Sequence, residues 1–379
     1  MILILSSEGD DNGLLAELAR LDPVIQGRLD RPGCIAVDRP PGPDPLPPLA
    51  WAQQVLPGAE RIAAPSINAW ARAILERIQT VLPEGQPWRL HILPHYGMRR
   101  QERMGARAWH SNLRRGGPRR DEPAQDSPDS IMAGAGENRC RWIESALKEL
   151  LKERRRHLLK SMTVSSAPFL EQDSLVQVVL TSPESGWISL LKAPGPYRWR
   201  QTLSPFPGGK IPVAVDKSAP SRAFAKLVEA QHRLGRAVLP GERCVDLGAS
   251  PGGWSYVVLQ QGGRVWSVDR SPLREDLMGH SSLTFIQGDA FTYRPEAPVD
   301  WLVCDVIAAP EKAIEMLLNW LRLGLMRWFV VTIKLKGEAD HPKLERLKRE
   351  LPHLTQDWSL VHLCANKGEV CALGRSKTP

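Results

Sequence analysis

The segment at residues 244–254, Cys-Val-Asp-Leu-Gly-Ala-Ser-Pro-Gly-Gly-Trp, restricts the possible folds of this chain more than any other stretch. An apolar run carries Asp246 near its end, a glycine-rich turn follows, and a helix is expected over 252–261. The glycines in the turn lack a Cβ atom, so the backbone there can come close to a ligand. Because free N–H groups at the start of a helix bind carboxylates and phosphates, this unit predicts a site for a nucleotide-type cofactor.

Strands and helices are predicted to alternate from residue 221 to the end of the chain. This pattern indicates a doubly wound α/β sheet, in which ligands bind at the carboxyl ends of the strands. The expected strands are 244–247, 265–268, 283–286, 301–306 and 329–335, the expected helices are 221–234, 252–261 and 311–323, and a hairpin of 360–364 and 370–373 closes the sheet.

Acidic residues close three of the predicted strands. Asp269 follows the second strand, where an acid can accept both hydroxyls of an adenosine ribose. Asp289 closes the third strand and is placed to take an adenine amino group, and Asp305 closes the fourth. One such acid alone would be interpreted as a helix cap or a turn residue. Three at successive strand ends indicate a ligand site instead.

Two other enzyme classes match parts of the same motif. Residues 248–252 fit the G-x-S-x-G pattern of hydrolases, and a triad of Ser250, Asp305 and His362 can be drawn. The oxyanion hole of that class uses the backbone N–H of the residue after the nucleophile, and here that residue is Pro251, which has none. The dinucleotide fingerprint G-x-G-x-x-G also fails, because position 250 is serine. Both interpretations are therefore disfavoured.

Two lysines and a glutamate flank the predicted cofactor site. Lys334 ends the apolar strand Phe-Val-Val-Thr-Ile-Lys, and a lysine at the end of a buried strand is uncommon unless it is paired. Lys226 lies on the helix before the first strand and would by itself be interpreted as a solvated lysine. Glu369 begins the last strand. For Lys334 we favour a functional role.

Together these residues resemble the FtsJ/RrmJ family of RNA 2′-O-ribose methyltransferases. The run Asp-Leu-Gly-Ala-Ser-Pro-Gly-Gly-Trp-Ser is similar to the cofactor motif of that family. The resemblance implies a Rossmann-like domain with a mostly parallel seven-stranded sheet, and S-adenosyl-L-methionine as cofactor. It assigns the catalytic Lys-Asp-Lys-Glu tetrad of the family to Lys226, Asp305, Lys334 and Glu369. It assigns cofactor binding to Ser221, Ser250, Pro251, Gly252, Gly253, Trp254, Asp269, Asp289 and Asp305.

The resemblance also implies a mechanism. The cofactor lies across the strand ends with its methyl group facing a ribose 2′-hydroxyl. Lys334 orients that hydroxyl and accepts or relays its proton, and Asp305 and Glu369 position the lysines. To act as a base Lys334 must be partly neutral, so we expect burial and the neighbouring Lys226 to lower its pKa.

The order of the preceding segments narrows the resemblance to the RlmM subgroup, whose members methylate a cytidine of 23S rRNA. It implies an α+β subdomain at 1–55, a THUMP-like RNA-binding domain at 56–195, a linker at 196–220 and the methyltransferase domain at 221–379. Within the THUMP-like part we expect helices at 66–82, with Ser66 as N-cap, and at 138–160, and strands at 88–93, 174–180 and 186–191.

An arginine-rich stretch interrupts the THUMP-like part at 98–137. It is rich in Gly, Pro, Ser and Asp behind the arginines and has few aliphatic residues, so we expect it to be a disordered insertion. An arm that grips RNA and a solvated loop are equally compatible with this composition. The insertion leaves the exact RNA target open.

The bulk properties agree with an RNA partner. The formal net charge is +8 and the pI is about 9.3, which favours a polyanion. No apolar run approaches the roughly 18 residues that a membrane span needs, and the cysteines form no C-x-x-C pair, so we expect a cytoplasmic protein with reduced thiols.

We expect RNA as the partner, no membrane, DNA or metal, and leave the oligomeric state open. The same chemistry on tRNA or another RNA, and a catalytically inactive RNA-binding or ribosome assembly factor, remain as alternatives. THUMP domains also serve tRNA enzymes, which keeps the first alternative open. The intact tetrad argues against the second.

Overall fold

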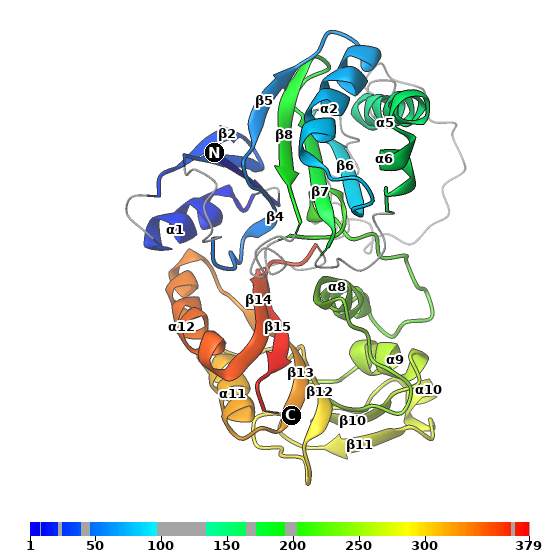
Figure 1. Cartoon of the computed structure of the whole chain (residues 1–379). Helices are drawn as coiled ribbons and strands as arrows, with labels where there is room; N and C mark the ends of the chain where they lie inside the picture. The colour runs from blue at the N-terminus through cyan, green and yellow to red at the C-terminus, as the bar shows by residue number, and fades with distance from the viewer. Residues whose placement is uncertain are drawn as a thin grey trace, which may run out of the picture.

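A computed structural model describes residues 1–7, 9–21, 25–38, 46–96, 134–163, 172–193, 203–364 and 368–378 (Figure 1). Most of the arginine-rich insertion and the first part of the predicted linker lie outside these residues. The predicted disorder and the RNA arm are therefore not tested. No helix in the described part of the chain is long and apolar enough to cross a membrane.

The C-terminal part contains a seven-stranded sheet in the order β11-β10-β9-β12-β13-β15-β14. β9, β10, β11, β12 and β13 run parallel, and β15 is antiparallel to both β13 and β14. The bounds are β9 (Arg243–Leu247), β10 (Arg264–Asp269), β11 (Leu283–Gln287), β12 (Val299–Cys304), β13 (Met326–Lys334), β14 (Thr355–Val361) and β15 (Glu369–Ser376). The predicted Rossmann-like, mostly parallel seven-stranded sheet with a closing hairpin is confirmed.

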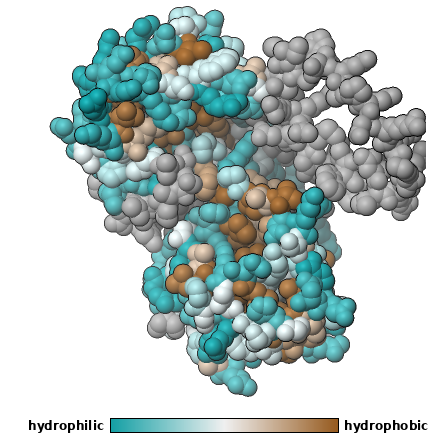
Figure 2. Space-filling model, turned by 90° about the vertical axis from the view of Figure 1, so that its right-hand side faces the viewer, coloured by the Kyte–Doolittle hydropathy of each residue, from teal (hydrophilic) through white to brown (hydrophobic). Residues whose placement is uncertain are grey.

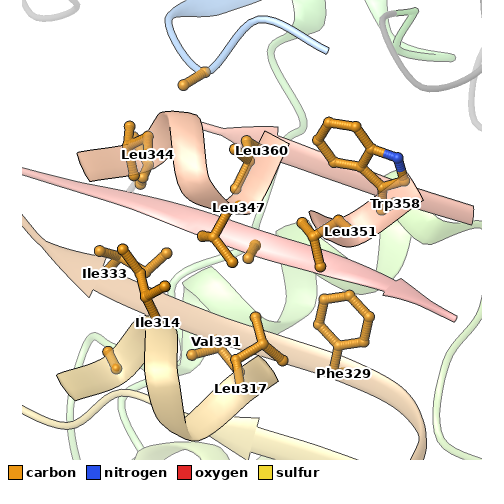
Figure 3. Packing of buried hydrophobic residues seen from close by; sticks show 14 of the residues in the cluster. Ile314, Leu317, Phe329, Val331, Ile333, Leu344, Leu347, Leu351, Trp358 and Leu360 are labelled. Carbon is orange, nitrogen blue, oxygen red and sulfur yellow. The ribbon is translucent and has the colours of Figure 1, made fainter. Parts of the chain in front are cut away.

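Helices cover both faces of this sheet (Figure 1). Those on one side are α8 (Phe224–Leu234), α9 (Gly253–Gln260) and α10 (Glu275–Met278), and those on the other are α11 (Pro310–Arg322) and α12 (Leu344–Leu354). Successive side chains of a strand point to opposite faces. Val330 accordingly packs in the cluster of α8 and α9, while Phe329 and Val331 pack against α11 and α12, as Figure 3 shows. The sheet is therefore apolar on both faces, as buried parallel sheets are.

The N-terminal half contains two four-stranded sheets, ordered β2-β3-β1-β4 and β5-β8-β7-β6. The elements of the first are β1 (Ile2–Ser6), α1 (Asp11–Leu21), β2 (Gly27–Arg31), β3 (Cys34–Val37) and β4 (Ala52–Leu56). Those of the second are β5 (Glu60–Ala63), α2 (Ile67–Val81), β6 (Trp88–Pro94), α5 (Ala135–Arg154), α6 (Arg156–Lys160), β7 (Ser174–Leu180) and β8 (Ser185–Leu191). As predicted, Ser66 caps α2, since its side chain accepts a hydrogen bond from the N–H of Ala69.

The predicted continuous helix at 138–160 is wrong in one respect. The structure has two helices there, because Arg155 adopts non-helical angles (φ −145°, ψ 56°). α5 also begins at Ala135, inside the stretch expected to be disordered. After the break Leu158 is buried, and its carbonyl accepts a hydrogen bond of 2.7 Å from the indole N–H of Trp88. The break between α5 and α6 is thus accompanied by the burial of Leu158 and its hydrogen bond with Trp88.

The sheet containing β1 lies between the other two. Ile4 shares a hydrophobic cluster with Leu347 of α12, whereas Leu3 and Leu5 share one with Trp187 of β8. Lys348 of α12 also forms an ion pair of 2.7 Å with the buried Glu17 of α1. Figure 2 shows apolar surface gathered on the face in view where the upper and lower parts of the molecule meet.

Candidate active site

Two lysines and two carboxylates form a closed ring at the carboxyl end of the parallel strands. Lys226 Nζ lies 3.1 Å from Asp305 Oδ2 and also contacts Glu369 Oε1. Lys334 Nζ contacts Asp305 Oδ1 and Glu369 Oε2. Each lysine therefore binds both carboxylates, and the structure brings together all four residues of the predicted tetrad.

The strand register explains why these residues meet. Lys334 ends β13 and is directly paired with Glu369, the first residue of the antiparallel β15. Asp305 follows β12, the parallel neighbour of β13. Lys226 comes from α8, which packs beside β15. Four separate elements thus each place one charged side chain at the same point.

Thr332 is a member of the site that the sequence analysis missed. Its hydroxyl donates a hydrogen bond of 2.6 Å to Asp305 Oδ1, and its side chain is buried. It lies two residues before Lys334 and so on the same face of β13. A polar residue at that spacing in an otherwise apolar strand was the signal that could have revealed it.

The predicted lowering of the Lys334 pKa is wrong for this structure. Burial does lower the pKa of the Lys334 ammonium, but Asp305 and Glu369 raise it more, so that it lies above its ordinary value. Burial raises the pKa of the Asp305 carboxyl, but Lys334 and Lys226 lower it more, so that it lies below its ordinary value. Contact with two carboxylates therefore outweighs burial, and Lys334 is held in the charged form.

The glycines of the turn are required by packing within the protein. Gly248 has φ +76°, and a Cβ atom there would lie 2.8 Å from Cα of Val306. A Cβ atom on Gly253 would lie 2.4 Å from Oγ of Ser221. The space that we expected a ligand to use at these two positions is thus occupied by neighbouring loops. Ser221 is placed directly against the turn, where the predicted cofactor site lies.

Asp269 organises the turn. Its Oδ2 accepts a hydrogen bond of 3.0 Å from the N–H of Ser250, and its Oδ1 accepts one of 2.9 Å from the N–H of Ser271. Pro251 and Gly252 follow Ser250, and Gly252 is the N-cap of α9. The first N–H groups of a helix have no partner inside it, so the start of α9 offers donors next to this carboxylate.

The other predicted cofactor residues differ in the groups that they can offer to a ligand. Trp254 is buried, and its indole N–H donates to the carbonyl of Ala223 at 2.7 Å, so its side chain serves the core. Asp289 is partly exposed, accepts a hydrogen bond of 2.8 Å from the N–H of Phe291 and pairs with Arg270 at 2.5 Å. The Phe291 and Arg270 contacts lower the pKa of Asp289. Asp289 therefore remains an accessible carboxylate and Trp254 offers its backbone.

The hydrolase triad is not assembled. The hydroxyl of Ser250 donates to the carbonyl of Pro272 at 2.9 Å. His362 Nδ1 lies 2.5 Å from Asp10 Oδ2, and Asp305 is held by the lysines. The structure thus agrees with the argument from Pro251 against this class.

Asp246 is a second residue that the sequence analysis left without a role. It is fully buried beneath the turn and accepts a hydrogen bond of 2.7 Å from the hydroxyl of Ser255. Burial raises its pKa to about 7, and the Ser255 hydrogen bonds oppose this shift. A carboxyl group that titrates near neutrality therefore lies close to the ring.

Comparison with known proteins gives a family match for the C-terminal part of the chain. Residues 219–347 match the family model described as FtsJ-like methyltransferase. This region is therefore similar to FtsJ-like methyltransferases, and we call it the FtsJ-like domain. Lys226, Asp305 and Lys334 lie inside the match, and the predicted family resemblance is confirmed.

Curated relatives match over a longer part of the chain. A protein from Thauera aminoaromatica is 32% identical over 209 residues, which cover 52% of this chain and 56% of that protein. One from Laribacter hongkongensis is 34% identical, with coverage of 50% and 55%, and one from Cellvibrio japonicus is 34% identical, with coverage of 39% and 44%. Each is named Ribosomal RNA large subunit methyltransferase M. The chain spans about half the length of the curated relatives it matches.

Proposed function

We propose that this protein transfers a methyl group from S-adenosylmethionine to the ribose 2′-hydroxyl of a cytidine in 23S rRNA. The observation that carries the proposal is the ring of Lys226, Asp305, Lys334 and Glu369 at the catalytic edge of an FtsJ-like domain. The choice of large-subunit rRNA follows the name of the relatives. We infer that the protein acts in the cytoplasm, where that RNA is made.

The residues at the strand ends fit this cofactor. Asp269 and Asp289 offer carboxylate oxygens for the hydroxyl and amino groups of a nucleoside. The first N–H groups of α9 suit a carboxylate such as that of a methionine moiety. Ser221 lies against the same turn. When bound, the cofactor would supply an electrophilic methyl group.

Lys334 orients the acceptor in this proposal. Its side chain is 22% exposed, against 11% for Lys226 and 7% for Glu369, so it is the ring member most open to a substrate. A charged Lys334 donates a hydrogen bond to the 2′-oxygen and fixes its position. Correct placement of two reacting groups can itself contribute roughly 7–11 kcal/mol.

The proton leaves the 2′-oxygen as the oxygen–carbon bond forms. At that point the hydroxyl becomes strongly acidic, so a weak base is sufficient. Asp305 and Glu369 both contact Lys334, and either carboxylate can accept this proton. The raised pKa of Lys334 therefore does not prevent the reaction.

The N-terminal half would supply affinity for RNA. We propose the division into residues 1–55, a THUMP-like domain at 56–195, a linker at 196–220 and the methyltransferase domain at 221–379. A cleft of about 460 Å³ between α2 and the end of α5 is lined by Arg72, Arg154 and Arg155, beside Leu75, Glu76 and Gln79. Arginines that converge on a cleft suit phosphate groups, so RNA binding should weaken steeply with salt.

The decisive experiment maps 2′-O-methyl groups on RNA from cells with and without the gene. Loss of one mark on a 23S rRNA cytidine supports the proposal, and loss of a mark on tRNA or another RNA moves the same chemistry to that substrate. No lost mark, together with no S-adenosylmethionine binding by calorimetry, would favour an inactive RNA-binding factor.

The purified protein gives a second test of the role of Lys334. Lys334→Ala should abolish methyl transfer and keep S-adenosylmethionine binding. Wild-type activity in that variant would contradict the role given to Lys334.

A further inference from the structure

A run of apolar residues at 306–309, Val-Ile-Ala-Ala, lies partly open to solvent. Ile307 is 91% exposed, and Ala309 is also exposed. Single exposed apolar side chains are common on protein surfaces and need no explanation. Here Ile307 and Ala309 alternate with the half-buried Val306 and Ala308, so the segment presents apolar surface to solvent as a unit. We call residues 306–309 the apolar loop.

The apolar loop lies within the catalytic edge of the FtsJ-like domain. It begins directly after Asp305 and leads into α11 at Pro310. On its other side Val306 packs so closely on Gly248 that a Cβ atom there would lie 2.8 Å from its Cα. The apolar loop is therefore held between the ring of charged residues and the glycine turn.

Two basic residues lie close in the chain to the apolar loop or to the ring. Lys312 lies in the first turn of α11, and Lys336 follows Lys334 by two residues. Both are exposed, and neither forms an ion pair with a residue in the described part of the chain. Lysines near an apolar surface suit a nucleotide, which joins a charged phosphate to a base with apolar faces.

We propose that Ile307 packs against the base of the nucleotide whose ribose is methylated. The inference rests on the proposed function and names the part of the substrate that this loop holds. An enzyme that acts on a nucleotide inside RNA must hold that nucleotide away from its stacked neighbours. An apolar side chain beside Asp305 replaces the lost stacking contact and thereby fixes the ribose at Lys334.

Leu323 provides a matched control. It is also a large apolar residue, 63% exposed, and it follows α11 at the end remote from the apolar loop. β13 begins shortly after it at Met326, so Leu323 lies at the amino ends of the strands. A general effect of removing exposed apolar surface would appear in Leu323→Ala as well as in Ile307→Ala.

The first experiment measures methyl transfer to an RNA fragment containing the nucleotide mapped above. Ile307→Ala should lower kcat/KM for RNA about tenfold, because it removes apolar contact with the base. Its S-adenosylmethionine affinity and Tm should equal those of wild type, and Leu323→Ala should behave as wild type throughout. Unchanged kcat/KM in Ile307→Ala overturns the inference, while an inactive wild type contradicts the proposed function instead.

The second experiment distinguishes a base contact from a general effect. It uses the same fragment with the base of the target nucleotide removed and the ribose intact. Wild type should then fall toward the level of Ile307→Ala, and the variant should lose little more, because the contact is already absent. Equal losses for both proteins on the abasic RNA would show that Ile307 and the base act independently and would overturn the inference.

Discussion

Two clusters of buried opposite charges in the described part of the chain are arranged differently. In the sheet of β6 and β7, Arg89 Nη2 lies 2.8 Å from Asp173 Oδ2, and the two side chains are 1% and 2% exposed. At the carboxyl end of the parallel strands, Asp305 and Glu369 are each shared by both lysines, and Lys334 is 22% exposed. The first pair is closed to solvent and the second cluster has an opening. The closed pair can therefore serve the fold alone, whereas the open cluster leaves room for a substrate to reach Lys334.

Breaking the closed pair should have the largest effect on stability. Arg89→Met leaves the buried Asp173 without its arginine, which should lower the free energy of unfolding by about 3–5 kcal/mol. Urea unfolding followed by circular dichroism measures this. The double variant with Asp173→Asn should recover much of the loss, and no recovery would mean that the charge of Asp173 is not the cause.

Breaking the open cluster should affect activity more than stability. In Lys226→Met both carboxylates keep their contact with Lys334, so neither becomes an isolated buried charge. We expect kcat to fall by about 100-fold, within the range of positioned proton-transfer groups, and the free energy of unfolding to change less than in Arg89→Met. Methyl-transfer kinetics and urea unfolding test both parts. A variant less stable than Arg89→Met would remove the distinction between the two clusters.

Removing a contact to the ring should have a smaller effect. Thr332→Val deletes the 2.6 Å hydrogen bond to Asp305 while keeping the shape of the side chain. The expected loss in kcat is about fivefold, since such a bond contributes roughly 1 kcal/mol. Thr332→Ser keeps the hydroxyl and should retain most of the activity. Equal activity of the two variants would show that the hydrogen bond is not used.

The two regions should also differ from Asp246 in how stability depends on pH. The pKa of Asp246 is raised to about 7 in the folded protein, against an ordinary value of 3.8. The neutral carboxyl therefore stabilises the folded protein fully below pH 3.8, and this contribution is lost as the pH rises toward 7. Wild type should therefore lose stability relative to Asp246→Asn between about pH 5 and about pH 8. The pKa of Asp305 is lowered, so its contribution is present throughout that interval and is lost in acid. Urea unfolding at several pH values should give a constant difference for Asp305→Asn, and a constant difference for Asp246→Asn would contradict the prediction.

Much of the FtsJ-like domain could be predicted because its signals are local. Parallel strands buried on both faces are continuous apolar runs, and Asp269 and Asp305 mark where they end. The ring followed from the resemblance, but its electrostatics did not. The raised pKa of Lys334 depends on distances to two carboxylates that lie 29 and 35 positions away in the chain.

The features that the sequence did not predict depend on contacts between residues far apart in the chain. Nothing local predicts the break at Arg155, and the reason for Gly248 appears once Val306 is placed against it. β1 was also poorly defined by sequence. Its run Ile-Leu-Ile-Leu lacks the alternation of a half-buried strand, because both of its faces are covered.

The covering of β1 on both faces has a mechanical consequence. The sheet of β1 contacts a different neighbour on each side, so it cannot move with one neighbour without losing its contact with the other. Relative movement of the FtsJ-like domain and the sheet of β7 and β8 would break the ion pair between Lys348 and Glu17 on one side or part Leu3 and Leu5 from Trp187 on the other. The separation between the arginine-lined cleft and the charged ring is thus set during folding, and an RNA that occupies both must match that fixed spacing.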